Sequence, residues 1–458
     1  MSDAVAETKR PLREDLRELG KAPRELWLIF LAKYLESLAY FSMTKMLVLW
    51  LSKDFGFTDM QAGWWVAMFS SIVTLLTVAV GFVGDAWGFR RVLIMAFASA
   101  IGARALMALA PTRTVAIIGL MAITFGTAAT IPVMTTAVRR YTPEKSRSFG
   151  FSFYYVVMNI GSASAGFLID WARGLFVVAG QKDLVPKIIA LPLLGPTRIS
   201  AYGLVFLVGF VCAILAFFVS LLIRKDADLE RAPLGESDAP AESPVKIARE
   251  LFGERPFRRF LLFVGLLAMV RLMFQHAFMT FPKYVTREMG AAYPFGKVWA
   301  INPIMIIILV PIVTALTRHR SAYSCIIAGA FISALSPFVL CLGATHATFV
   351  GMVVVLSIGE ALWSPRVYEY TATIAPRGRE SSYMGLSYLP LFLAKIVVGP
   401  LSGFLLAHYV PEQAPRRSEI MWLIIGLMTL AGPILLLFLR RFIEADAKKT
   451  LTPPELPA

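Results

Sequence analysis

The chain has 458 residues, of which 57% are hydrophobic and only 16% charged, and this composition excludes a soluble fold. The formal net charge of +15 could indicate nucleic-acid binding, but most basic residues lie in short loops between apolar runs. That placement predicts an anionic lipid surface as the partner, and no nucleic acid.

The apolar runs predict membrane-spanning helices. Runs of roughly 20 to 28 residues recur about twelve times, and each can cross a hydrocarbon core of about 30 Å as a helix. We therefore expect an all-α membrane protein with 12 transmembrane helices, whose spans lie at 26–51, 61–85, 92–110, 114–138, 149–176, 201–223, 260–284, 298–316, 322–342, 348–375, 384–409 and 420–439.

The charges of the loops predict the topology. Alternate loops carry about 28 Lys and Arg on one side of the membrane and about 10 on the other, and the richer side is expected to be cytoplasmic. Both termini and the long central loop fall on that side. Short loops and the lack of an Asn-x-Ser/Thr acceptor in the sequence favour a bacterial inner membrane.

The first span contains an unusual pair of charges. Glu36 lies about 15 Å into the predicted helix at about 1.5 Å per residue, where an ionised group costs roughly 2.5 to 3.5 kcal/mol. Lys33 and Tyr40 share its helix face. This group can bind a polar solute, with Glu36 carrying a proton, or it can be a structural ion pair that locks two helices. Both interpretations stay open at this point.

The loop between the second and third spans carries a second signal, in Gly81, Asp85, Gly88, Arg90 and Arg91. Glycines allow helices to approach closely, and Asp85 can meet Arg91 or the positive end of a neighbouring helix. We expect these five residues to form a gating latch that favours closure of one side of the protein. An ordinary charged turn is the alternative.

Asparagine occurs only twice in the chain, at Asn159 in the fifth span and Asn302 in the eighth. An amide offers both a donor and an acceptor, which suits a neutral or zwitterionic solute; hydrogen bonding between helices is the alternative. Tyr155 lies one helical turn before Asn159 and is a candidate to line a cavity. Asp170 and Arg173, in the same span, are predicted to pair near the outer mouth.

The composition changes abruptly in the middle of the chain, where a charged segment leads into a stretch rich in Pro, Ser and Glu. We predict a cytoplasmic tail, a six-helix bundle, a cytoplasmic linker, a second six-helix bundle and a second tail, at 1–24, 25–224, 225–259, 260–441 and 442–458. This layout, with the loop at 81–91, resembles the major facilitator superfamily. The resemblance implies two bundles that rock about a site near the membrane midplane.

The second half places further ionisable groups inside its spans. Glu360 lies deep in the tenth span and is a candidate to contact substrate or carry a proton. Arg271 in the seventh span can bind an anionic substrate group or neutralise Glu360. His276 in the same span can relay protons or pack between helices. We expect Lys395, and Arg104 in the third span, to be structural or to snorkel toward the interface.

Three phrases resemble the proton-coupled oligopeptide transporter family: Phe-Tyr-Tyr-Val-Val-Met-Asn-Ile-Gly-Ser at 153–162, Trp-Ala-Ile-Asn-Pro at 299–303 and Gly-Glu-Ala-Leu-Trp-Ser-Pro at 359–365. They resemble its fifth, eighth and tenth helices. The resemblance implies that Glu360 receives the amino group of a peptide in a site that also includes Asn159 and Asn302.

The chain also departs from that family. The family's first helix carries Glu-x-x-Glu-Arg, where this chain has Lys33, Glu36 and Ser37. The fourth-helix Lys of the family corresponds to Ile131. The seventh-helix Glu-Gln corresponds to Phe274 and Gln275. In the family the missing groups couple protons and hold a peptide carboxylate. The resemblance therefore supports the scaffold but puts ordinary dipeptide symport in doubt.

Together these features predict a secondary active transporter that moves a small polar or zwitterionic solute by alternating access, with protons coupled through Glu36 and Glu360. The candidate substrate-binding residues are Lys33, Tyr40, Tyr155, Asn159, Arg271, Gln275, Asn302 and Glu360. A proton-coupled exporter of amphipathic compounds, favoured by 19 Met and 33 Phe, and a transporter-like sensor are the alternatives.

Enzymatic chemistry is not expected. The sequence has no phosphate-cradling glycine loop, no nucleophile–base arrangement and no metal cluster, and its three cysteines lack metal-ligand spacing. We therefore predict no cofactor and no metal, and we expect a monomer.

Overall fold

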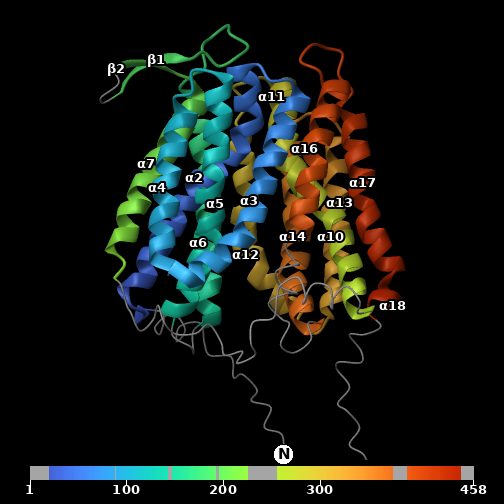
Figure 1. Ribbon diagram of the computed structural model, residues 1–458. Helices are drawn as coiled ribbons and strands as arrows, with labels where there is room; N and C mark the ends of the chain where they lie inside the picture. Colours follow the sequence, from blue (N-terminus) through green and yellow to red (C-terminus); the bar gives the residue numbers. More distant parts are fainter. Residues whose placement is uncertain are drawn as a thin grey trace, which may run out of the picture.

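The computed structural model of the chain describes residues 20–87, 89–142, 147–191, 195–224, 255–374 and 389–444. Figure 1 shows long helices standing side by side in two groups, one built from the first part of the chain and one from the second. We call these groups the N-terminal half and the C-terminal half.

The N-terminal half contains the helices α2 Arg24–Phe55, α3 Asp59–Trp87, α4 Phe89–Ala108, α5 Arg113–Tyr141, α6 Arg147–Gly174 and α7 Ala201–Leu222. In this half α2 packs along α5, α6 and α7, and α4 packs against α5 and α7. The first helix therefore lies at the centre of its own bundle, which explains why so much of it is buried.

The C-terminal half contains α10 Arg255–Met279, α11 Phe281–Met289, α12 Phe295–Leu316, α13 Ala322–Leu340, α14 His346–Ile374, α16 Leu389–Tyr409, α17 Ser418–Phe438 and the short α18 Arg440–Ile443. Here α13 packs against α14 and α17, and α10 packs against α16 and α17. The two halves meet where α3 packs on α16 and α6 packs on α12.

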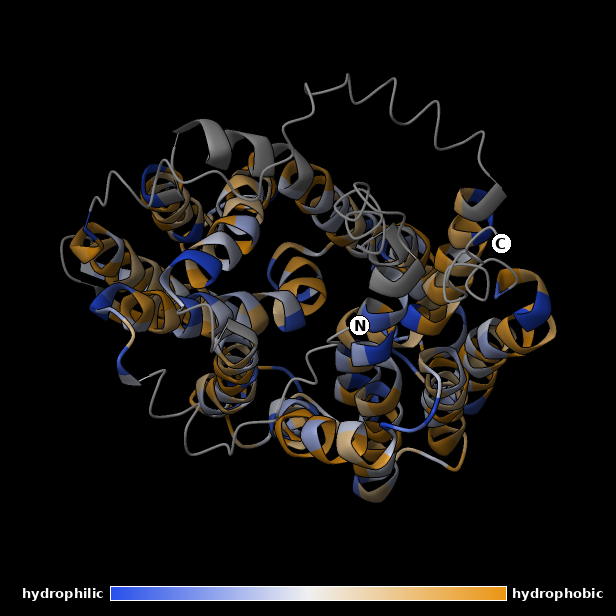
Figure 2. Cartoon of the chain, turned by 90° about the horizontal axis from the view of Figure 1, so that it is seen from below, coloured by the Kyte–Doolittle hydropathy of each residue, from blue (hydrophilic) through white to orange (hydrophobic). Residues whose placement is uncertain are grey.

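Eleven helices of the described part have the length and composition needed to cross a membrane. They correspond to eleven of the predicted spans, and α16, with 21 residues, lies at the remaining one. In Figure 2, orange apolar residues dominate the helices of both halves. The predicted all-α membrane protein is confirmed.

Two expectations about the elements need correction. The predicted span 260–284 is broken at Thr280, because Pro282 in the first turn of α11 cannot donate a backbone hydrogen bond to the preceding helix. The loop between α6 and α7 forms an antiparallel hairpin from β1 Lys187–Leu191 and β2 Gly195–Ile199, a feature that the helical prediction omitted. Its β-branched Ile and Thr residues favour an extended backbone.

The bundle boundaries stay predictions; in the N-terminal half α2 begins at Arg24 and α7 ends at Leu222. In the second half, α10 begins at Arg255, inside the predicted linker 225–259, because basic residues can extend a helix beyond its apolar part. The tail 1–19 and most of the linker and the C-terminal tail lie outside the described residues.

Local signals in the sequence explain several helix ends. Thr112 and Ser200 begin α5 and α7, and each side chain accepts a hydrogen bond from a backbone N–H of the first turn. Gly56 ends α2 with φ of 64°, a left-handed conformation that glycine adopts without strain. All three helix ends lie on the same face of the bundle.

We name the two faces by what lies there. The hairpin side carries β1 and β2, and the opposite terminal side holds the start of α2 and the short α18 (Figure 1). Consecutive spans alternate in direction, so α2, α6, α10 and α16 run from the terminal side to the hairpin side. This direction sets the depth of each polar group described below.

Candidate functional site

The N-terminal half buries a charged cluster around Glu36. Lys33 Nζ donates a hydrogen bond of 2.9 Å to Glu36 Oε2, and these residues are only 6% and 9% exposed. The ammonium also lies 5.3 Å from the ring centroid of Tyr154 on α6, which is a cation–π distance. The pair that the sequence suggested is therefore formed, and its cation contacts a neighbouring helix.

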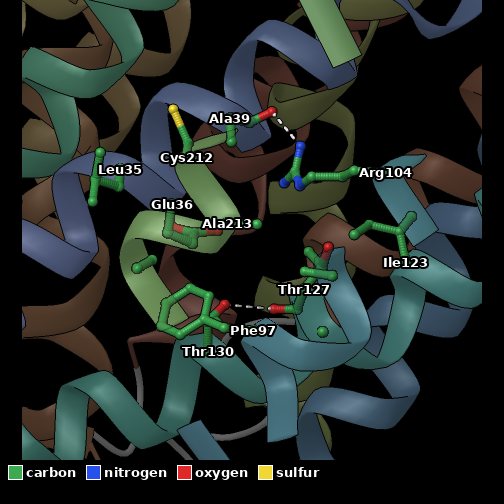
Figure 3. A pocket seen from close by; sticks show the side chains of 13 residues that line it. Leu35, Glu36, Ala39, Phe97, Arg104, Ile123, Thr127, Thr130, Cys212 and Ala213 are labelled. Carbon is green, nitrogen blue, oxygen red and sulfur yellow. Dashed lines mark hydrogen bonds between the residues drawn. The ribbon is translucent and has the colours of Figure 1, made fainter. Parts of the chain in front are cut away.

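Glu36 also lines a small cavity inside the N-terminal half, shown in Figure 3. The cavity, about 20 Å³, has room for one water molecule and is lined by α2, α4, α5 and α7. Arg104 from α4 lines it as well, donates a 3.0 Å hydrogen bond to the Ala39 carbonyl, and lies within electrostatic range of Glu36. Because Arg104 is 4% exposed, it is a buried structural cation and does not snorkel.

The remaining predicted residues of this half are less closely gathered. Tyr40 is partly buried and lies within electrostatic range of Lys33 and Glu36. Asn159 is buried and its amide donates a 2.9 Å hydrogen bond to the carbonyl of Tyr155, within its own helix. Tyr155 is 37% exposed on the same helix. The structure thus brings Tyr40 to the charged cluster and gives Asn159 a local partner.

The C-terminal half contains a second polar group, centred on Glu360. Asn302 Nδ2 on α12 donates a 2.8 Å hydrogen bond to Glu360 Oε2 on α14, and a 3.0 Å hydrogen bond to Ser357 Oγ. Both Asn302 and Glu360 are partly exposed, deep within apolar helices. A neutral amide therefore holds this carboxylate in place without forming an ion pair with it.

One cation, Arg271, lies beside this carboxylate, and a second cation, Lys395, lies beside Arg271. The Arg271 guanidinium is 4.9 Å from the ring centroid of Trp363 and within electrostatic range of both Glu360 and Lys395. Arg271 and Lys395 are both partly exposed. Among the residues that the structure describes, neither has a carboxylate within salt-bridge distance. Lys395 therefore belongs to this cluster, although the sequence suggested only a structural or snorkelling role.

Gln275 and His276 lie deeper in the packing of the same half. Both residues are buried. His276 Nδ1 is 2.7 Å from Thr280 Oγ1, which in turn donates a 2.8 Å hydrogen bond to Ser402 Oγ on α16. This arrangement matches the packing interpretation of His276, because its polar contacts join α10 to α16.

On the hairpin side, charged residues tie the two halves together. Asp59 at the start of α3 accepts hydrogen bonds from Lys283 Nζ at 2.7 Å and from Arg287 Nη2 at 2.8 Å. Both cations lie on α11 of the C-terminal half and are at most 9% exposed in their side chains. We call this group the Asp59 latch.

A second connection joins α6 to α12. Asp170 accepts hydrogen bonds from the backbone N–H groups of Gly296 at 3.0 Å and Lys297 at 2.7 Å, the first turn of α12. Arg173 lies 3.7 Å from Asp170, as its spacing predicted, and donates to the carbonyls of Tyr293 and Ala291. A carboxylate at a helix N-terminus is favourable because the exposed N–H groups there are positive.

Glycine pairs let the halves approach closely on this side. A Cβ atom on Gly63 of α3 would lie 2.1 Å from the Gly399 carbonyl oxygen, and one on Gly166 of α6 would lie 2.2 Å from the Gly296 carbonyl oxygen. No residue larger than glycine fits at these contacts without separating the helices. These contacts and the hydrogen bonds of Asp59 and Asp170 join the two halves on the hairpin side, which we describe as closed.

The predicted gating residues lie at the opposite, terminal side. The side chain of Asp85, the surroundings of Gly81 and all of Gly88 lie outside the described residues. Arg90 donates hydrogen bonds to the carbonyls of Ile223 at 2.5 Å and Leu221 at 3.0 Å, at the end of α7 in its own half. Arg91 is exposed. Arg90 therefore caps the C-terminal end of α7.

Sequence reasoning missed several residues that the fold brings together. Lys45 is 2% exposed in α2 and donates hydrogen bonds to the Ser162 carbonyl at 3.1 Å and to Ser162 Oγ at 3.4 Å. Lys45 could have been identified from the sequence, because a lysine inside an apolar span is unusual. The partners in the Asp59 latch gave no such signal, because they lie at helix ends where charges are common.

Metal ligation finds no support in the described part of the chain, where no group of three or more His, Cys, Asp or Glu residues could hold an ion. The three cysteines are unpaired, two of them buried. The chemistry of the polar clusters is therefore that of charges, amides and hydroxyl groups inside apolar helices.

Two helical halves that join at one face, with ionisable groups held deep between their helices, define a membrane transport protein. The Major Facilitator Superfamily model matches residues 29–342 of the sequence. The chain belongs to this superfamily, and it is a secondary transporter of that type, integral to a membrane, and not an enzyme.

Solved structures of peptide transporters share the fold. A mutant of a peptide transporter POT matches with a TM-score of 0.69 at 17% identity, over 92% of this chain and 95% of that one. A POT family transporter in complex with 5-aminolevulinic acid matches with a TM-score of 0.68 at 14% identity, over 92% and 97%. A bacterial homologue of the human drug peptide transporters matches equally well, over 92% and 99%. No curated protein matches the sequence.

Proposed function

We propose that this secondary transporter moves a small polar solute by alternating access and couples the movement to protons. The observation that carries the proposal is the cluster of Glu360, Asn302, Arg271 and Lys395. These side chains are partly exposed in the middle of apolar helices, where an ionisable group needs a functional reason. We propose that they face the substrate pathway between the halves.

The closed hairpin side supports the alternating-access part of the proposal. In this model of transport, the Asp59 latch and the glycine contacts keep the hairpin side shut while the terminal side opens. The latch then breaks, and the hairpin side opens. By the distribution of Lys and Arg, we propose that the terminal side is cytoplasmic. The short loops and the lack of an Asn-x-Ser/Thr acceptor support a bacterial inner membrane. The closed face would then be the external one.

Glu360 is the better placed of the two carboxylates to carry a proton. Its described hydrogen-bond partner is a neutral amide, so gaining a proton breaks no salt bridge. Glu36 has Lys33 at 2.9 Å and Arg104 nearby, so protonation there would leave buried cations without a counter-charge. We therefore propose Glu360 as the main coupling residue, and Glu36 as a group that acts only when its cluster opens.

The related structures support a small polar solute. Peptide transporters of similar fold are described in complex with 5-aminolevulinic acid, with alafosfalin and with a thioalcohol-conjugated peptide. The present chain keeps the Asn302–Glu360 pair but has Lys33 and Ser37 where the peptide transporter family carries acidic and basic residues. We propose a solute related in size to these ligands, with different end groups.

Uptake into proteoliposomes tests the proposal. A screen of small solutes with an inward pH gradient should find one whose uptake collapses when a protonophore removes the gradient. In Glu360→Gln, gradient-driven uptake should fall at least about tenfold, while counterflow exchange of the same solute is retained. Undiminished gradient-driven uptake by this variant would falsify the coupling role. Solute leaving the vesicles in exchange for protons would instead identify an exporter.

A further inference from the structure

We infer that the transported solute is an organic anion, recognised by Arg271 and Lys395 through a carboxylate, phosphonate or sulfonate group. This inference rests on the proposed transport function and names its substrate class. The reason is an imbalance of charge in the C-terminal half, where Arg271 lies near Glu360 and also near a second cation, Lys395.

The position of Lys395 directs it toward the interface between the halves. It lies one helical turn before Gly399, so the two residues share a face of α16. A Cβ atom on Gly399 would lie 2.3 Å from Ala67 Cβ on α3, so this face points at the N-terminal half. About 14 residues separate Lys395 from the end of α16, which is about 21 Å of helix at 1.5 Å per residue. Lys395 therefore lies well inside the membrane.

Arg271 approaches the same place from α10. Its guanidinium group lies 4.9 Å from the ring centroid of Trp363, a contact that restrains the side chain, and is within electrostatic range of both Glu360 and Lys395. A guanidinium group fixed in this way presents N–H donors that match the two oxygens of a carboxylate or phosphonate. Arg271 is partly exposed, so its side chain is not fully enclosed by the protein.

The carboxylates of the described part do not balance these cations. Glu360 already accepts a hydrogen bond from Asn302, and it is one negative charge against two positive charges. Glu36 is bound to Lys33 inside the N-terminal half and is only 9% exposed. An uncompensated cation in an apolar environment is costly, and an anionic solute removes this cost when it binds.

The same arrangement disfavours a free amino group on the solute. An ammonium group placed at Glu360 would lie close to Arg271, and like charges repel strongly where water is scarce. For a peptide with both ends charged, the carboxylate end would therefore favour binding, and the amino end would oppose it. A solute with the anionic group and no amine avoids this loss.

Three forms of one dipeptide separate these cases. Ala-Ala is a zwitterion, N-acetyl-Ala-Ala is an anion and Ala-Ala amide is a cation, and all are of similar size. Succinate and succinamide add a second pair that differs only in charge. Binding of each probe at millimolar concentration is measured by thermal unfolding of the purified full-length chain. Uptake of each is measured in proteoliposomes.

We expect N-acetyl-Ala-Ala and succinate to raise the unfolding temperature, and succinamide and Ala-Ala amide to leave it unchanged. In Arg271→Gln and in Lys395→Met, affinity for the anions should fall about tenfold, the size expected for loss of one charge-assisted hydrogen bond. Arg271→Lys keeps the charge and should retain part of the affinity, which separates recognition from folding. The control Lys187→Gln removes an exposed cation of the hairpin and should behave as the unmodified chain.

Binding of Ala-Ala or Ala-Ala amide in preference to the anions overturns the inference, and so does a lack of stabilisation by every anion. Gradient-driven uptake of Ala-Ala without anion binding would overturn the anionic class while the transport function stands. Binding of the anions, lost in both cation variants but without uptake of any probe, would support the site and overturn transport.

Discussion

Asn302 on α12 and Glu360 on α14 are joined by a 2.8 Å hydrogen bond from the amide to the carboxylate, midway through two apolar helices. One of the two asparagines of the chain thus holds one of its few carboxylates buried in a span. The same amide also donates to Ser357, so both of its N–H groups are used on α14.

Replacing Asn302 should therefore impair Glu360 more than a simple loss of packing would. In Asn302→Leu the carboxylate loses its described hydrogen-bond donor, and uptake of the transported solute should fall about tenfold or more. Asn302→Gln, which keeps the amide, should retain more activity. Initial uptake rates in proteoliposomes measure both. Equal rates for the leucine variant and the unmodified chain would show that the hydrogen bond has no role.

The Lys33–Glu36 pair should behave as a buried ion pair in stability measurements. Lys33→Met leaves Glu36 without its closest cation and should lower the free energy of unfolding by about 3 kcal/mol. Lys33→Met with Glu36→Leu removes both charges and should be less destabilising than the single change. Chemical unfolding of the full chain in detergent measures the free energy of unfolding of Lys33→Met, Glu36→Leu and the double variant. A double variant as unstable as the sum of the single variants would contradict a coupled pair.

Opening of the hairpin side should depend on the Asp59 latch. Asp59→Asn weakens the contacts to Lys283 and Arg287 and leaves these two cations to repel each other, so the closed state should become less populated. Hydrogen–deuterium exchange at the hairpin-side ends of α3 and α11 should increase, with little change at the opposite ends. Glu419→Gln, at the start of α17 and outside the latch, is the matched control. Unchanged exchange in the Asp59 variant would mean that the latch does not hold the halves.

Close packing of Gly63 on Gly399 should be needed for closure of the same side. In Gly63→Val the added carbon atoms would meet the Gly399 carbonyl oxygen, which lies 2.1 Å from a Cβ at this position. Transport should be lost while the chain still folds, because each half has its own packed interior. Gly102→Val on α4 has no atom within 4 Å of its Cβ position and serves as the control. Normal transport by Gly63→Val would exclude this role of the contact.

The membrane-spanning helices show how much of the fold the hydropathy of the sequence predicts. A run of apolar residues forms a helix in a membrane because every backbone group must be paired within the segment, so hydropathy alone located the helices. The break at Thr280 and the hairpin between β1 and β2 escaped this pattern, since the first depends on Pro282 and the second lies outside the apolar runs. Both arise from local backbone preferences.

The site was predicted in part. A charge inside an apolar run is conspicuous, so Lys33, Glu36, Arg271 and Glu360 could be named from the sequence, and the spacing of Lys33 and Glu36 also predicted their pairing. The assignment of partners across helices could not be made. In the sequence, Lys395 and Arg104 look alike, because each is a basic residue inside an apolar run. In the structure, Arg104 is enclosed within the N-terminal half, whereas Lys395 lies near Arg271.

By itself, the sequence determined that this chain is a membrane protein of two six-helix halves with a few charged residues inside its spans, because burial in lipid constrains each segment separately. Only the tertiary structure decided which charges meet, that Glu36 lies near Arg104 while Glu360 accepts a hydrogen bond from Asn302, and that Asp59 joins the halves on the hairpin side. These relations depend on the rotation and depth of each helix against its neighbours, and the packing of distant segments sets both.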